Sequence, residues 1–165
     1  MDAPSPPTLD VTAVDHVYVT VRDLIRSIAF YDAVMRLLGF RKGTKAIAGE
    51  PHAHYFNPVT QYTIRQARNA VAHDPYSPGL HHLCFRVATR YDVDAAAAGL
   101  RALGIEASTP VLYPEYAADY YATFFTDPDG IRLEIVALRA MRTLVQDHWA
   151  ELTAFEDPLQ KAGLV

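Results

Sequence analysis

The stretch Leu80-His81-His82-Leu83-Cys84-Phe85-Arg86-Val87 alternates between apolar and polar side chains with a period of two. This period is typical of a strand with one buried face. The apolar set is expected to pack into a core: Leu83, Phe85 and Val87. The polar set lies on the other face of the strand: His82, Cys84 and Arg86. A strand with a purely structural role does not need these residue types there. His81 shares the direction of the apolar set in this register, so we prefer His82 to His81 as a ligand.

Two further strands show the same division into a core face and a polar face. Residues 15–21 place His16 opposite a row of valines, 66 positions before His82. Residues 131–136 place Glu134 between Leu133 and Ile135 and therefore on the non-core face. Two histidines and one carboxylate on such faces are the ligand set of a divalent metal that keeps open coordination positions.

The chain repeats itself at an interval of about 65 residues, which indicates two similar units. Each histidine strand precedes a predicted helix, over residues 24–38 and 91–103, and both helices end at a Leu-Gly pair. Strand-like segments follow each helix. We therefore predict five segments: a loose arm over 1–12, a βαβββ module over 13–70, a linker over 71–79, a second βαβββ module over 80–137, and an amphipathic C-terminal helix and tail over 138–165.

Composition excludes several kinds of partner. The net charge is −4 and no basic stripe occurs, so we expect no nucleic acid. No apolar run approaches the length of a membrane span, and the first residues do not have the pattern of a signal peptide. The single cysteine, Cys84, fits a reducing cytoplasm. The apolar stripe between Leu138 and Phe155 motivates the expectation of a homodimer.

Several motifs occur in the order found in a known family: Asp15-His16-Val17, Leu38-Gly39-Phe40, the strand from His82 to Val87, Phe125-Thr126-Asp127-Pro128-Asp129-Gly130, and Leu133-Glu134-Ile135. In these motifs the chain resembles the vicinal oxygen chelate superfamily of glyoxalase I, bleomycin-resistance proteins and extradiol dioxygenases. The resemblance implies an α+β fold in which two βαβββ modules form a curled mixed sheet around a metal cup. It also implies that His16, His82 and Glu134 hold the metal.

The sequence departs from the glyoxalase pattern in the first module. Glyoxalase-type members take a fourth ligand, commonly glutamate, from the last strand of that module, which here is residues 61–67 and contains no acid. We expect Ile64 or Gln66 in that position. Gln66 offers a carbonyl oxygen to a metal or substrate, but it cannot move a proton as a base. This absence favours chemistry other than that of glyoxalase.

We therefore expect an Fe(II)- or Mn(II)-dependent enzyme that acts on a small molecule with vicinal oxygens, with an extradiol (ring-cleaving) dioxygenase as the first choice. The alternatives are a glyoxalase-type lyase, isomerase or epimerase, for which Zn(II) or Ni(II) are the other metals, and a protein that sequesters a ligand as bleomycin-resistance proteins do. Four tyrosines lie close together in the chain near the presumed pocket: Tyr113, Tyr116, Tyr120 and Tyr121.

From this group we select Tyr121 and Tyr116 as catalytic candidates and Tyr113 as a substrate contact, together with Gln66. Arg86 is expected either to hold a substrate anion or to pair with Glu134. The remaining histidines are interpreted as surface residues: His52, His54, His73 and His148.

Overall fold

Two four-stranded sheets with the same strand order organise the chain in the computed structural model, which describes residues 9, 11–69 and 71–165. Most of the predicted arm, residues 1–8 and 10, lies outside the described residues. The chain divides into two compact units, residues 1–72 and 73–165, and each is described by itself below.

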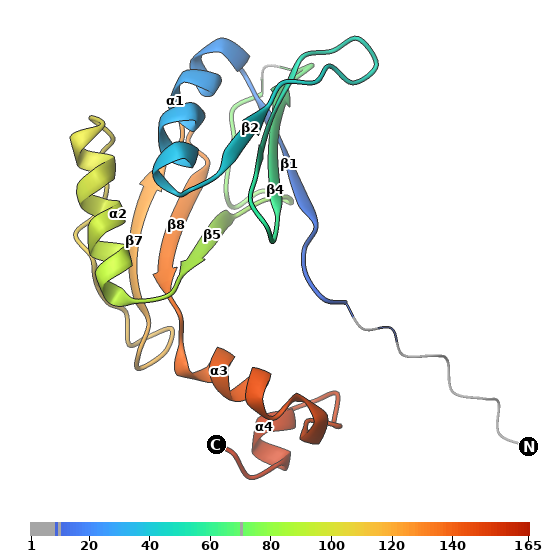
Figure 1. Ribbon diagram of the computed structural model, residues 1–165, viewed down its shortest axis with the longest axis vertical. Coiled ribbons are helices and arrows are strands. Elements are labelled where there is room, and N and C mark those ends of the chain that lie inside the picture. The colour runs from blue at the N-terminus through green and yellow to red at the C-terminus, as the bar shows by residue number, and fades with distance from the viewer. Residues whose placement is uncertain (1–8, 10, 70) are drawn as a thin grey trace, which may run out of the picture. The chain divides into compact units, whose positions relative to one another are not determined.

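The first unit contains one helix and four strands (Figure 1): β1 His16–Val21, α1 Leu24–Leu37, β2 Arg41–Gly43, β3 His52–Phe56 and β4 Gln61–Gln66. The strands are ordered β1-β4-β3-β2. Strand β1 runs parallel to β4, and the other neighbours are antiparallel. The sheet is therefore mixed, and the helix α1 and the strands β2 and β3 lie between β1 and its partner β4 in the chain.

The second unit repeats this plan: β5 His82–Val87, α2 Arg90–Ala102, β6 Val111–Leu112, β7 Tyr121–Thr126 and β8 Arg132–Ala137. The order is β5-β8-β7-β6, and β5 is parallel to β8. The α+β class and the paired βαβββ organisation are confirmed.

Each helix covers one face of its own sheet. In the second unit α2 lies along β7 and β8 (Figure 1). Its buried side chains face the fully buried Leu133 and Ile135 of β8: Val93, Ala96, Ala97 and Leu100. The alternation of a strand then sends Glu134 to the opposite face. The core on the helix side thus fixes which residues of β8 remain for the polar face.

The predicted ends of the helices agree with the structure to within one residue. Asp23 caps α1, because its carboxylate accepts a hydrogen bond from the Arg26 amide at 3.0 Å. Gly39 and Gly104 follow the two helices with φ of 80° and 75°, a backbone conformation that glycine adopts without strain.

A C-terminal helix is present as predicted, but it ends before the apolar stripe does. The segment forms α3 Ala140–Asp147, a short 3-10 turn over Trp149–Glu151, and α4 Pro158–Lys161. Since proline lacks an amide hydrogen, Pro158 starts a new helix instead of continuing the old one. Apolar residues of α3 and α4 line a common groove of about 630 Å³. Leu152 of the stripe is buried, whereas Trp149 and Phe155 stay exposed.

Within the part of the chain that the structure describes, no helix combines the length and the apolar character that a membrane crossing needs.

The capping box of α2 gives a test of the repeat unit's stability. Thr89 accepts from the Asp92 amide at 3.2 Å, and Asp92 accepts from the Thr89 amide at 2.9 Å. Thr89→Ala should lower the free energy of unfolding by about 1 kcal/mol, measured by urea denaturation. Thr44→Ala, in an exposed loop, is the control and should change it by less than about 0.5 kcal/mol. An equal effect of both substitutions would contradict the prediction.

Candidate metal centre

The register of β5 against β8 assembles the polar face of the second unit. His82 pairs with Arg132, and Cys84 pairs with Glu134. All four side chains therefore leave by the face opposite α2. This arrangement follows from the sequence pattern, because the apolar alternates of both strands point toward the helix.

Glu134 is the centre of this face. Its side chain is only 2% exposed, and a buried carboxylate is costly unless it has partners. The Tyr120 hydroxyl donates to Oε1 at 2.5 Å, and Oε2 lies 3.4 Å from Nε2 of His82. Two donors that bind one metal at about 2.1 Å with angles of 90–109° are about 3.0–3.4 Å apart. The spacing of His82 and Glu134 therefore fits a shared divalent metal.

His81 does not point away from His82 as strand alternation suggested. Strand β5 begins at His82, so alternation does not constrain the residue before it. The two Nδ1 atoms are 2.7 Å apart, and the rings are nearly perpendicular. A hydrogen bond between these nitrogens orients the His82 ring and leaves its Nε2 for Glu134 or a metal.

His16 begins β1 in the first unit and shows the same local device. Its Nδ1 donates to Oδ2 of Asp15 at 2.8 Å, so Nε2 is the nitrogen available to a ligand. In both units the residue before the histidine therefore engages Nδ1. No group of three His, Cys, Asp or Glu side chains suited to a metal occurs among the described residues, and the three-ligand set stays a prediction.

The structure corrects the residue that matches Glu134 in the first unit. Tyr18 pairs with Thr63 as Cys84 pairs with Glu134, so the matching position is Thr63. Ile64 is fully buried in the core. The Gln66 amide is used at the start of α1, where Oε1 accepts from the Leu24 amide at 3.0 Å and Nε2 donates to the Arg22 carbonyl at 2.6 Å. Gln66 shares a strand face with Tyr62 and Ile64, which are buried in the core. This alternation in the sequence indicates that Gln66 does not lie on the polar face.

Among the tyrosines, Tyr120 and not Tyr121 contacts the carboxylate. Tyr121 donates to Oδ1 of Asp94 on α2 at 2.7 Å, and the Arg90 guanidinium lies 5.5 Å from its ring. Since Phe125 belongs to the core face, alternation along the strand places Tyr121 on that face. Tyr120 lies one residue before β7, so its contact with Glu134 comes from the structure and not from strand alternation.

A pocket of about 570 Å³ opens over the His82–Glu134 pair. Its lining is aromatic and charged: Tyr76, His81, His82, Tyr116, Tyr120, Phe124, Arg132 and Glu134. Tyr116 packs edge-on against Tyr120 with ring centroids 5.2 Å apart, and Tyr113 stacks on Tyr116 from behind. Arg86 lies on the same strand face but is exposed and does not line this pocket.

The pKa values of two groups around Glu134 are shifted. Burial, and then the hydrogen bond to Glu134, raise the pKa of the Tyr120 hydroxyl above its usual value. Burial and the charge of Glu134 raise the pKa of the Cys84 thiol to about 12. Both groups therefore stay protonated at neutral pH, and Tyr120 is a hydrogen-bond donor to the carboxylate.

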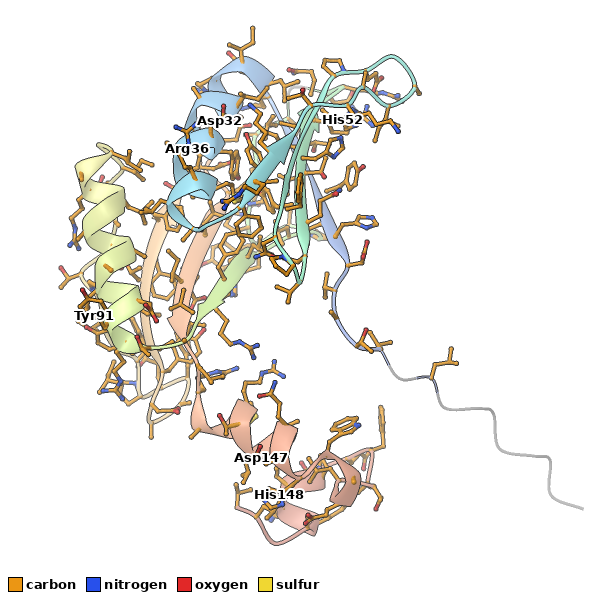
Figure 2. All side chains as sticks on the ribbon, viewed as in Figure 1. Asp32, Arg36, His52, Tyr91, Asp147 and His148 are labelled. Atoms are coloured by element: carbon orange, nitrogen blue, oxygen red, sulfur yellow. The ribbon has the colours of Figure 1, made fainter. Side chains whose placement is uncertain are left out.

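The prediction that His52 and His54 are surface loop residues was wrong. Both belong to β3, where Figure 2 labels His52. Their rings stack with centroids 5.7 Å apart, and His52 is 5% exposed. His52 Nδ1 bonds the Glu50 carbonyl at 2.8 Å, and His54 Nδ1 bonds the Thr63 hydroxyl at 3.0 Å. These bonds explain how polar rings are accommodated in the sheet.

Two βαβββ units with the same strand order define the fold class of the chain. The sequence pattern of the Glyoxalase/Bleomycin resistance protein/Dioxygenase superfamily matches residues 13–135, and the chain belongs to this superfamily.

Three similar proteins illustrate this membership. YqjT of Bacillus subtilis (strain 168), an uncharacterised protein, is 29% identical over 129 residues, which cover 74% of this chain and 96% of YqjT. A glyoxylase/bleomycin resistance protein/dioxygenase domain from Frankia sp. EAN1pec has a TM-score of 0.63 and 25% identity, with 79% of this chain and all of that chain covered.

The third is a mutant of the fosfomycin resistance protein FosX from Listeria monocytogenes, complexed with Mn(II) and a dihydroxypropylphosphonic acid. Its TM-score is 0.61 at 16% identity, with 82% of this chain and 98% of that chain covered, so it supports the fold.

The hydrogen bond from Tyr120 to Glu134 predicts a specific loss of metal affinity. Tyr120→Phe removes the donor that holds Oε1, and affinity for Mn(II) should fall about 10-fold or more in a chelator competition titration. Tyr121→Phe is the matched control, because its hydroxyl contacts Asp94 instead. Equal affinities of the two variants would refute a positioning role for Tyr120.

Proposed function

We propose that this protein is a metal-dependent enzyme that acts on a small molecule with vicinal oxygens, as an extradiol-type dioxygenase. The observation that carries the proposal is the buried Glu134 carboxylate, which faces His82 Nε2 at 3.4 Å inside an aromatic pocket. A structural role alone does not require a carboxylate to be buried beside a histidine in an open pocket, since burial of the carboxylate is costly.

In this proposal His82 and Glu134 hold the metal, and His16 is the third ligand on the evidence of the sequence resemblance. Fe(II) or Mn(II) would supply electrophilic binding of both substrate oxygens and a means of reaction with O₂. Tyr120 keeps one carboxylate oxygen occupied, so that Oε2 remains directed at His82. His81 fixes the ring of His82 by its contact with Nδ1.

The first unit supports a dioxygenase over a lyase or isomerase. A reaction that removes a proton from carbon needs a base near the metal. Thr63 occupies the position that matches Glu134, and its hydroxyl is already bonded to His54. A threonine cannot act as such a base at neutral pH. The first module therefore contributes no carboxylate from β4.

The tyrosine roles are revised within the same proposal. Tyr116 stays a candidate for contact with the reacting group, because it lines the pocket. We assign the role foreseen for Tyr121 to Tyr120, whose hydroxyl reaches Glu134. Tyr113 supports Tyr116 from behind, with their centroids 6.0 Å apart.

We further propose a homodimer in the cytoplasm. Trp149 of the C-terminal segment is 64% exposed and Phe155 is fully exposed, which leaves apolar surface for a second copy. Sedimentation should show a species of twice 18.3 kDa at micromolar concentration. A monomer under these conditions would refute the homodimer.

The reaction is tested with the metal-loaded protein. Fe(II)- or Mn(II)-loaded protein should consume O₂ with members of a catechol and enediol panel, measured with an oxygen electrode. His82→Ala and Glu134→Ala should each lower metal retention at least 10-fold and abolish oxygen uptake. The His81→Ala variant should still bind the metal, with an affinity that is only partly reduced.

Two other results would contradict the dioxygenase. Isomerisation of methylglyoxal–thiol adducts with Ni(II) or Zn(II), without oxygen uptake, would assign the protein to the lyase and isomerase group. Purification without any metal, combined with tight binding of an organic ligand, would assign it to the sequestering proteins.

A further inference from the structure

Arg132 is the charged residue of the pocket that the proposed reaction does not use. It stands opposite His82 in the parallel register and two residues before Glu134 on the same face of β8. It is half-buried and lines the pocket. No ion pair or side-chain hydrogen bond involves Arg132 among the described residues of the chain.

The neighbouring charges do not neutralise Arg132. The oxygens of Glu134 face Tyr120 and His82. Arg139, another cation nearby, lies over the Tyr120 ring at 5.2 Å and is outside the lining of the pocket. A guanidinium that lines a pocket without a protein partner is suited to bind a carboxylate, because it offers several donors in one plane.

We propose that Arg132 anchors the carboxylate of an aromatic acid whose vicinal oxygens reach the His82–Glu134 pair. Arg132, His82 and Glu134 line the same pocket of about 570 Å³, which lies in the size range of pockets for small organic ligands. The rings of Tyr116, Tyr120 and Phe124 in the lining favour a flat unsaturated body between the two ends. This inference rests on the proposed function for the diol end and on Arg132 for the acid end.

The test compares two probes that share the catechol ring: 3,4-dihydroxybenzoate, which carries the carboxylate, and catechol, which does not. Binding to the Mn(II)-loaded protein is measured by calorimetry without oxygen, so that no turnover occurs. The protein should bind 3,4-dihydroxybenzoate at least about 10-fold more tightly than catechol. Benzoate, with the carboxylate alone, should compete with it.

Variants identify the anchor. Arg132→Gln should remove the preference for the acid and leave catechol affinity within about 2-fold, whereas Arg132→Lys should keep part of the preference because the charge remains. Arg142→Gln, an exposed arginine of α3, is the control and should keep the full preference. Circular dichroism and thermal unfolding establish that each variant is folded.

Three results would overturn the inference: equal affinity of the unaltered protein for both probes, an acid preference that survives Arg132→Gln, or its loss in Arg86→Gln instead. The proposed reaction can fail separately. An acid preference that depends on Arg132, with no oxygen uptake on any diol, would support the anion anchor and contradict the dioxygenase.

Discussion

The parallel pairing of β5 with β8 is the constraint on which the candidate centre depends. It joins the first and last strands of the module, which are about 50 positions apart in the chain, and it sets His82, Cys84, Arg132 and Glu134 on one face. A shift of the pairing by one residue would turn Glu134 into the helix-packed core and expose Leu133. The burial of Leu133 and Ile135 under α2 therefore protects the geometry of the polar face as well as the fold.

The same constraint explains why Tyr120 matters. A carboxylate that is 2% exposed loses most of its hydration, and the hydroxyl at 2.5 Å restores one strong contact. The second oxygen is left toward His82 and the pocket. Tyr120 thus fixes Oε1 of Glu134, and Oε2 is directed at His82. A carboxylate held in this way keeps its orientation without a bound metal.

The strand faces could be predicted wherever apolar residues alternated cleanly. Glu134 and His82 were placed by Leu133, Ile135 and Phe85, and the repeat predicted both helices to within a residue. The direction of a side chain could not be predicted where the residue lies outside the alternating part of the strand. His81 precedes the first ladder residue, and its direction is set by contact with His82.

The remaining errors have similar causes. Gln66 shares the strand face of Tyr62 and Ile64, which is directed at α1, and therefore does not match Glu134. The C-terminal stripe has the helical period, but this period does not predict that α3 ends at Asp147 or that α4 begins at Pro158. A lone arginine on a strand, such as Arg132, has no sequence signal, and its position in the pocket is what distinguishes it.

The internal repeat has a consequence for how such a protein changes over evolutionary time. Each half has its own helix, its own sheet and its own histidine with the preceding residue on Nδ1. A substitution at Thr63 can therefore alter the acid–base character of one half while the other half keeps Glu134 and Tyr120 unaltered. Duplication in this way separates the evolution of reaction type from the maintenance of the scaffold, and closely similar chains can diverge in chemistry without losing their fold.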